Sequence, residues 1–307
     1  MKAARIREPE GFEGIDGLSY EDAPRPQPAI GDALVQVRAA SFTPTELMWP
    51  LSTDRNGHDR GARIPAHEGS GVVVELGWGT AGVSVGEEVF GLIDGYRDGW
   101  AAEYVTIEAR SLAPKPKTLD FVEAAALPQA GLTSWQALFD HGHLQSGQTV
   151  LIHGAAGGVG ATGVQLARWA GAHVIGTGRA SARARALELG ADEFVDVERD
   201  GWEKSVAPVD LVYDIIGGDV LAKSVALVKP GGAIVSIVGP PPEDRTDIRT
   251  IGFVRDPSGV ELREIARLVD EGVLTPQVDA VFPLEDARKA FMAKSTEHIP
   301  GKVVLTP

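Results

Sequence analysis

Residues 1–120 carry short runs of apolar and β-branched residues that Gly and Pro interrupt, a pattern typical of β-strands. The clearest predicted strands are 33–39, 71–76, 88–92 and 103–107. Residues 43–49 predict a short helix, because Thr43 suits the N-cap and Pro44 the first helical position. Residues 52–64 are polar and predict a surface loop.

From about residue 122 the pattern changes to alternating strands and helices. Residues 121–139 are typical of a helix that breaks at Pro128 and Gly131. Further along, apolar segments predict strands at 149–152, 173–177, 194–197, 211–216 and 233–238, and between them helices at 160–170, 181–189 and 220–228. Repeated strand–helix units predict a doubly wound parallel sheet and an α/β fold. After an amphipathic helix at 260–270, residues 273–307 return to short strands.

A glycine-rich turn joins the strand at 149–152 to the helix at 160–170. It contains Gly154, Gly157, Gly158 and Gly160. Such a turn lets the backbone approach a pyrophosphate closely, and the helix N-terminus offers unpaired N–H groups and the positive end of its dipole. Because the required strand and helix flank this turn, the sequence predicts a dinucleotide-binding site.

The same stretch resembles the medium-chain dehydrogenase/reductase superfamily, in particular its quinone oxidoreductase and zeta-crystallin branch. That branch is marked by Ala-Ala-Gly-Gly-x-Gly, then Gln, then a basic residue three positions later, and the matching residues here are Ala155, Ala156, Gly157, Gly158, Gly160, Gln165 and Arg168. The resemblance extends to ALVQVRAASFTP, IPAHEGSGVVVELG, GLTSWQAL and GKVVL. It implies a β-rich, GroES-like catalytic domain at 1–124 and 259–307, a Rossmann domain at 125–258, and a homodimer.

The end of the second Rossmann strand indicates which dinucleotide binds. An acidic residue there binds the ribose 2′-OH of NAD in dinucleotide-binding folds. Here Gly178 stands at the expected place of that acid, Arg179 follows it, and Arg183 comes one helical turn later. Guanidinium groups bind phosphate well. The sequence therefore predicts NADPH as the cofactor.

The remaining cofactor contacts follow from the turn and from the strand ends, where ligands of parallel sheets bind. Besides Gly178, Arg179 and Arg183, the predicted contacts are Ala156, Gly157, Gly158, Val159, Gly160, Thr177, Gly217, Val238 and Gly239. The resemblance implies that Thr133 faces the cofactor and that Phe253 and Val254 lie near the nicotinamide amide. The alternative for these last two residues is a core strand.

The resemblance also raises the question of zinc. The zinc alcohol dehydrogenases of this superfamily carry a Gly-His-Glu motif whose His binds the metal beside two cysteines. Here His67-Glu68 remains, but the cysteine positions fall in the segment 41–44 and near Gln129-Ala130, and the chain has no cysteine. One His and one Glu do not make a four-ligand site, so no catalytic zinc is expected. His67 is then either a catalytic residue or a hydrogen-bonded cleft histidine.

Without a metal, hydride transfer favours acceptors that delocalise the resulting charge. A quinone or an α,β-unsaturated carbonyl does so, and a few neutral hydrogen-bond donors then suffice. The candidate catalytic residues are Thr43, His67, Tyr96 and Gln129. Family members often carry Asn-Pro-x-Asp where this chain has Thr43-Pro44-Thr45-Glu46, so no role of that Asn transfers. Trp49, Tyr96 and Trp100 either line a substrate slot or belong to the core.

These observations predict an NADPH-dependent, zinc-independent reductase of quinones or activated C=C bonds. Three alternatives stay open: a carbonyl reductase or alcohol dehydrogenase that uses a side-chain acid, a non-catalytic NADPH-binding protein, and an enoyl reductase acting on carrier-bound chains. Substrate assays would separate the first two from the predicted activity.

The composition and charge of the chain exclude several kinds of partner and cofactor. The formal net charge of the 307 residues is −14, which disfavours nucleic acid and anionic membranes. The absence of cysteine excludes disulfides, iron–sulfur clusters and thiol nucleophiles. The N-terminal segment lacks the apolar core of a signal peptide, and no apolar run approaches the roughly 20 residues that span a bilayer. The expected location is the cytoplasm.

Overall fold

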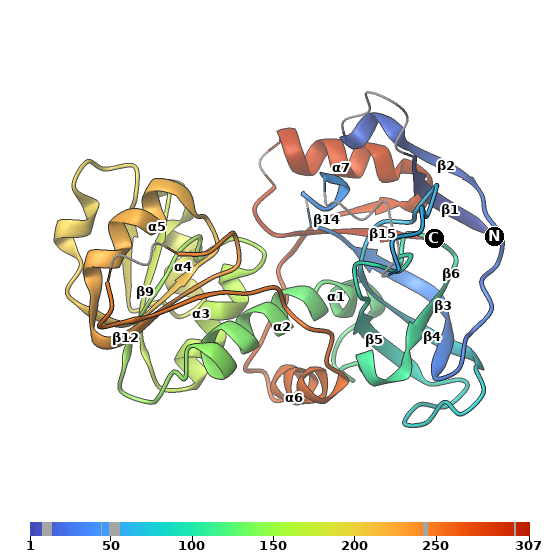
Figure 1. Ribbon diagram of the computed structural model, residues 1–307, viewed down its shortest axis with the longest axis horizontal. Helices are drawn as coiled ribbons and strands as arrows, with labels where there is room; N and C mark the ends of the chain where they lie inside the picture. The colour runs from blue at the N-terminus through green and yellow to red at the C-terminus, as the bar shows by residue number, and fades with distance from the viewer. Residues whose placement is uncertain (8–13, 44, 49–55, 242–244, 298) are drawn as a thin grey trace. The chain divides into compact units, whose positions relative to one another are not determined.

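The computed structural model describes residues 1–7, 14–43, 45–48, 56–241, 245–297 and 299–307 (Figure 1). The contacts divide the chain into two compact units. The first comprises Met1–Gln129, Asp256–Glu271 and Pro276–Pro307, and the second comprises Ala130–Arg255 and Gly272–Thr275. In the part of the chain that is described, no helix is long and apolar enough to cross a membrane.

The first unit is built on antiparallel strands. Its main sheet has the order β14-β15-β3-β4-β5-β7, with β6 also paired to β3, and a separate ribbon joins β1 and β2. The bounds are β1 Lys2–Ile6, β2 Leu18–Asp22, β3 Asp32–Ser41, β4 Glu68–Leu76, β5 Glu88–Leu92, β6 Tyr104–Glu108, β7 Leu112–Pro114, β14 Val278–Pro283 and β15 Lys302–Thr306. All pairings are antiparallel except β14 with β15. Of the C-terminal segment, residues 276–307 belong to this first unit.

Three helices cover this sheet. They are α1 (Phe121–Ala125), α6 (Gly259–Asp270) and α7 (Ala287–Thr296). Helix α7 packs on β14, β15 and β2, and Phe291 from it stacks on Phe42 with ring centroids 3.7 Å apart. Trp100 is fully buried against Gly69, where an added Cβ would lie 2.5 Å from the indole ring. Trp100 is therefore a core residue and not a wall of a substrate slot, while Trp49 lies outside the described residues.

The second unit is a six-stranded parallel sheet. Its strand order is β10-β9-β8-β11-β12-β13, which is the order of dinucleotide-binding folds, and it reverses between β8 and β11. The bounds are β8 Thr149–Ile152, β9 His173–Gly178, β10 Glu193–Asp196, β11 Val209–Asp214, β12 Val228–Ser236 and β13 Arg249–Gly252, with helices α3 Gly160–Trp169, α4 Arg183–Glu188 and α5 Gly218–Ser224. Helix α3 packs on β8 and β9, and α4 packs on β9 and β10.

Several predicted helices differ in extent from the observed ones. Among the described residues of 43–49, Glu46–Met48 form a 3₁₀ turn, and the Glu46 side chain accepts the backbone N–H of Thr43. The helix predicted over 181–189 begins as a 3₁₀ turn at Ala180–Ala182, and its start has no side-chain cap. Pro128 starts α2 (Pro128–Trp135), consistent with its missing N–H, whereas Gly131 lies inside α2 and does not break it.

Candidate functional site

Hydrogen bonds and an ion pair link six polar residues of the first unit in series, partly through the backbone N–H groups of Gln129 and Thr43. We call this series the polar chain, and its members in order are Lys302, Glu68, Gln129, Thr43, Glu46 and His67. All of them are buried except Thr43, which is partly exposed. The first half of the polar chain starts with the ion pair between the Lys302 ammonium and Glu68 Oε1. The other oxygen of Glu68 accepts the backbone N–H of Gln129 at 2.8 Å.

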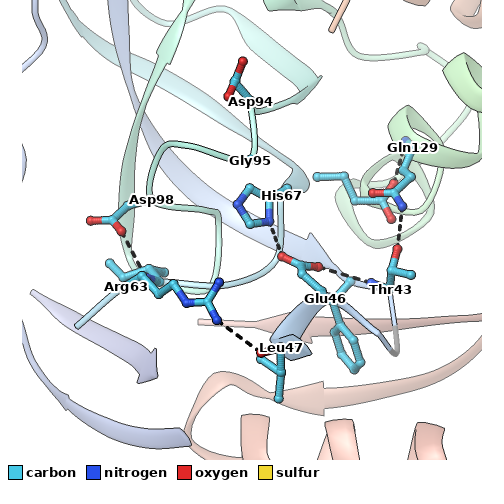
Figure 2. Close-up of polar contacts among 12 residues, drawn as sticks. Thr43, Glu46, Leu47, Arg63, His67, Asp94, Gly95, Asp98 and Gln129 are labelled. Carbon is cyan, nitrogen blue, oxygen red and sulfur yellow. Dashed lines mark hydrogen bonds and ion pairs between the residues drawn. The ribbon is translucent and has the colours of Figure 1, made fainter. Parts of the chain in front are cut away.

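The second half of the polar chain contains three of the four predicted catalytic residues (Figure 2). Gln129 Nε2 donates to Thr43 Oγ1 at 2.5 Å. The backbone N–H of Thr43 donates to Glu46 Oε2 at 3.3 Å, and Glu46 Oε1 binds His67 Nδ1. The fourth predicted residue, Tyr96, lies in the turn after β5, with its N–H on the Asp94 carboxylate and 45% of the residue exposed.

The polar chain arises because strand and helix ends meet at one place. Glu68 begins β4, Lys302 begins β15, and Gln129 is the second residue of α2. Just before His67, Ala66 has a φ of +66°, a left-handed conformation that is costly for a residue other than glycine. Backbone hydrogen bonds from Trp100 to Ala66 and from Ile93 to His67 hold this turn. Residues held in such conformations cluster at functional sites.

The directions of the hydrogen bonds define the available chemistry. An ionised carboxylate only accepts, so His67 Nδ1 donates the hydrogen bond to Glu46 Oε1. Thr43 Oγ1 already accepts from Gln129, so its own hydroxyl proton is directed elsewhere. Thr43 is also the member of the polar chain with partial exposure. The arrangement can therefore present a neutral, oriented hydroxyl donor to the oxygen of a ligand.

The glycine-rich turn of the second unit fits a dinucleotide pyrophosphate. Gly154 has a φ of +61°, and a Cβ at Gly160 would lie 2.2 Å from the Gly154 carbonyl oxygen, so both positions need glycine. The N–H of Ala155 ties the turn to the Thr177 carbonyl of β9 at 3.0 Å. Helix α3 begins directly after the turn, and no side chain caps it. Its first amides, around the predicted contacts Gly158 and Val159, are suited to bind phosphate oxygens.

Comparison with known proteins agrees with this architecture. Residues 29–117 match the family of alcohol dehydrogenase GroES-like domains, and residues 189–305 match the zinc-binding dehydrogenase family. The 2-methylene-furan-3-one reductase of Solanum lycopersicum is 33% identical to this chain, over 96% of it and 77% of that protein. A chloroplastic NADPH-dependent alkenal/one oxidoreductase of Arabidopsis thaliana is 31% identical, over 96% and 78%. The quinone oxidoreductase structure from Coxiella burnetii covers 100% of this chain and 99% of its own, with a TM-score of 0.88 and 30% identity.

The chain belongs to the medium-chain dehydrogenase/reductase superfamily. The fold class and the quinone oxidoreductase branch predicted from the sequence are confirmed. As a member of this superfamily the protein is an oxidoreductase, and its second unit has the fold that binds nicotinamide dinucleotides.

Zinc is part of the name of one matched family, but the donor set of this medium-chain dehydrogenase/reductase does not fit the metal. At or beside the two cysteine positions stand Thr43 and Gln129, and they bind each other. A neutral hydroxyl and a neutral amide are poor substitutes for thiolates as zinc ligands. Among the described residues, no group of three or more His, Cys, Asp and Glu side chains is arranged to hold a metal ion.

Exposed apolar side chains follow three neighbouring strands of the second unit. Ile216, Val238 and Val254 are 53%, 56% and 76% exposed and come after β11, β12 and β13. Between the first two, the buried Asp214 carboxylate accepts the N–H of Gly217 at 3.0 Å and the Ser236 hydroxyl at 2.8 Å. These hydrogen bonds hold the backbone after β11 and β12 in place. The exposed apolar side chains therefore lie at the edge of the sheet where ligands of parallel sheets bind. Phe253 lies against His141, and Thr133 is buried in α2; their contacts with a cofactor stay predictions.

Both arginines predicted to bind a 2′-phosphate contact β10 or the residues after it. Arg179 Nε lies 3.3 Å from Glu198 Oε1. Arg183 donates to the Phe194 carbonyl at 3.0 Å, and its guanidinium lies 6.0 Å from the Phe194 ring centre. Sequence reasoning missed these contacts, as it missed Lys302, because the partners lie on other strands.

A buried histidine, which sequence reasoning also missed, supports the cofactor edge. His153 Nε2 lies 2.9 Å from Ser224 Oγ, which donates its own proton to the Val220 carbonyl. Nε2 therefore carries the ring proton, and Nδ1 accepts from Thr177 Oγ1 at 2.8 Å. Burial lowers the pKa of His153 to about 4, although the nearby Asp214 opposes this shift. The neutral ring thus joins β8, β9 and α5.

This histidine predicts a pH dependence of stability. In the unfolded chain the imidazole takes up a proton near pH 6.5, whereas in the folded protein it does so only near pH 4. Between these values the unfolded state binds more protons, so the free energy of unfolding falls as the pH falls. At about 1.4 kcal/mol per pH unit, His153 should account for roughly 3 kcal/mol of lost stability between pH 7 and 4.

Urea unfolding at pH 7, 5.5 and 4.5 measures this loss. A His153→Gln variant serves as the control, because its side chain remains neutral while the carboxylates titrate as before. The two proteins are compared by the slope of their free energy of unfolding against pH, and the difference between the slopes gives the contribution of His153. Equal pH slopes in the two proteins would contradict the prediction.

Proposed function

We propose that this protein is an NADPH-dependent, zinc-independent reductase that transfers hydride to a quinone or to the C=C bond of an α,β-unsaturated carbonyl. The hydrogen bond between Gln129 and Thr43 carries this proposal, because it puts a neutral donor pair where zinc enzymes of the superfamily have thiolates. Relatives support the acceptor class, since two are named as reductases of an alkenal/one and of a methylene-furanone and one as a quinone oxidoreductase.

The bound dinucleotide supplies hydride from C4 of its nicotinamide. The chain's own residues then stabilise the charge that develops on the acceptor oxygen. Thr43 Oγ1 donates its proton in a hydrogen bond to that oxygen, and Gln129 orients the hydroxyl. Because the charge of an enolate or hydroquinone anion is spread over several atoms, neutral donors suffice. Glu46 accepts hydrogen bonds from His67 Nδ1 and from the backbone N–H of Thr43, which holds the ring beside Thr43.

The partners proposed for this activity are small molecules. The net charge of −14 disfavours polyanionic partners such as nucleic acids. A homodimer, with catalytic residues 1–124 and 259–307 and cofactor residues 125–258 in each copy, remains a proposal from the family resemblance.

The test follows NADPH oxidation with matched acceptors. These are pent-3-en-2-one, its saturated counterpart pentan-2-one, a 1,4-benzoquinone and an enoyl thioester. We expect kcat/KM for the enone or the quinone to exceed that for pentan-2-one at least tenfold. Faster reduction of pentan-2-one would instead favour a carbonyl reductase, and strong preference for the thioester would favour an enoyl reductase. NADPH binding without turnover of any acceptor would favour a non-catalytic protein.

A further inference from the structure

The end of β9 has no acidic residue of its own. In the parallel sheet of the second unit, however, an acidic residue that follows the neighbouring strand β10 lies beside it. Strands β9 and β10 are neighbours, with Asp196 opposite Gly178. The N–H of Val197 binds the Gly178 carbonyl at 3.1 Å, so the pairing continues one residue further. Glu198 then falls beside Arg179, and the two side chains form an ion pair of 3.3 Å.

Other charges gather at the same edge. Arg199 lies 3.6 Å from Asp196, and Arg183 reaches the backbone of β10. A pocket of about 160 Å³ opens there and is lined by Ala180, Arg183, Phe194, Val195, Asp196, Arg199, Trp202 and Ser205. Guanidinium groups and carboxylates thus lie together at the ends of β9 and β10, where Arg179 and Arg183 are predicted to bind the 2′-phosphate.

We propose that Glu198 is a specificity-determining residue that weakens the preference for 2′-phosphorylated dinucleotides by competing for the Arg179 guanidinium. The inference rests on the proposed use of NADPH. A 2′-phosphate that binds Arg179 displaces the Glu198 carboxylate and then lies near its negative charge. The 2′-hydroxyl of NADH is neutral, so a carboxylate does not repel it and accepts its hydrogen bond.

The pair is exposed enough to exchange partners. The side chains of Arg179 and Glu198 are 57% and 62% accessible, and exposed ion pairs contribute little stability. A doubly charged phosphate is the stronger partner for a guanidinium. Glu198 therefore lowers the affinity for the phosphate without excluding it, which makes the selectivity adjustable by one side chain.

The experiment measures binding of cofactor fragments to the full chain by calorimetry. The probes are 2′,5′-ADP and 5′-AMP, which differ only in the 2′-phosphate. We expect Glu198→Gln to tighten binding of 2′,5′-ADP about three- to tenfold and to leave 5′-AMP unchanged or weaker. The control is Glu188→Gln, which removes the same charge at the far end of α4 and should change the ratio of the two affinities less than twofold.

A double-mutant cycle tests the role of Arg179. Arg179→Ala alone should weaken 2′,5′-ADP, and the gain from Glu198→Gln should shrink when Arg179 is absent. The proposal is overturned if Glu198→Gln changes the affinity ratio no more than Glu188→Gln does, or if its effect is the same without Arg179. Because binding of fragments needs no turnover, these outcomes are distinct from failure of the proposed reductase activity or of NADPH preference in the unaltered protein.

Discussion

Replacing Lys302 by methionine is expected to lower the free energy of unfolding by about 3–5 kcal/mol. The reason is the fully buried Glu68 carboxylate, whose cationic partner in the polar chain is Lys302. Without the ammonium group, a fully buried carboxyl group whose other oxygen binds the Gln129 N–H would lose its cationic partner. Urea unfolding at pH 7 measures the loss.

Two further variants make this result interpretable. In the double variant Lys302→Met/Glu68→Gln the amide oxygen still accepts the Gln129 N–H, neither charge of this ion pair remains, and most of the stability should return. Lys289→Met removes an exposed lysine that pairs with Asp286, and it should change stability by less than about 0.5 kcal/mol. A loss at Lys302 no larger than that at Lys289 would show that the buried ion pair is not needed.

Replacing Thr43 by valine is expected to lower kcat/KM for the enone or quinone about 10²–10³-fold, the range seen when one donor to a developing oxyanion is removed. Valine keeps the shape of threonine but has no hydroxyl to bind the acceptor oxygen. Thr43→Ser keeps the hydroxyl and should restore most of the activity. Affinity for NADPH, measured by fluorescence, should be unchanged in both variants.

Gln129 supplies the second part of this test. Gln129→Met removes the hydrogen bond that orients the Thr43 hydroxyl, and we expect a smaller loss in kcat/KM than for Thr43→Val. In the double variant the two losses should not add, because the residues act as one unit. Wild-type kcat/KM in Thr43→Val, with the protein folded and NADPH bound, would remove Thr43 from the mechanism.

The cofactor half of the protein could be predicted from the sequence because its signals are local. The strand, glycine turn and helix of 147–168 are contiguous, and the need for glycine at Gly154 and Gly160 comes from contacts within that turn. The alternation of strands and helices then limits the sheet to a few topologies. Even so, helix 181–189 was predicted too long, because no pattern shows that its first turn is 3₁₀ and uncapped.

The candidate catalytic site could be predicted only in part. Thr43, His67 and Gln129 were found by resemblance, and the structure brings them together. Lys302 was not found, because its position opposite Glu68 depends on the pairing of β15 with β3 and of β3 with β4. Glu198 was not found for the same reason, since it follows β10 and its neighbour Arg179 follows β9, the strand paired with it. Long-range strand pairing leaves little trace in the sequence of either partner.

The position of Lys302 has a consequence for how the protein is made. Protein chains emerge from the ribosome N-terminus first, and continuous domains fold as units during synthesis. The second unit is nearly continuous, whereas the first needs segments from both ends of the chain. Glu68 is therefore synthesised long before Lys302, the lysine that pairs with it. Until β15 has been added, Glu68 of the nascent first unit lacks its cationic partner, so the final packing around this carboxylate waits for the release of β15.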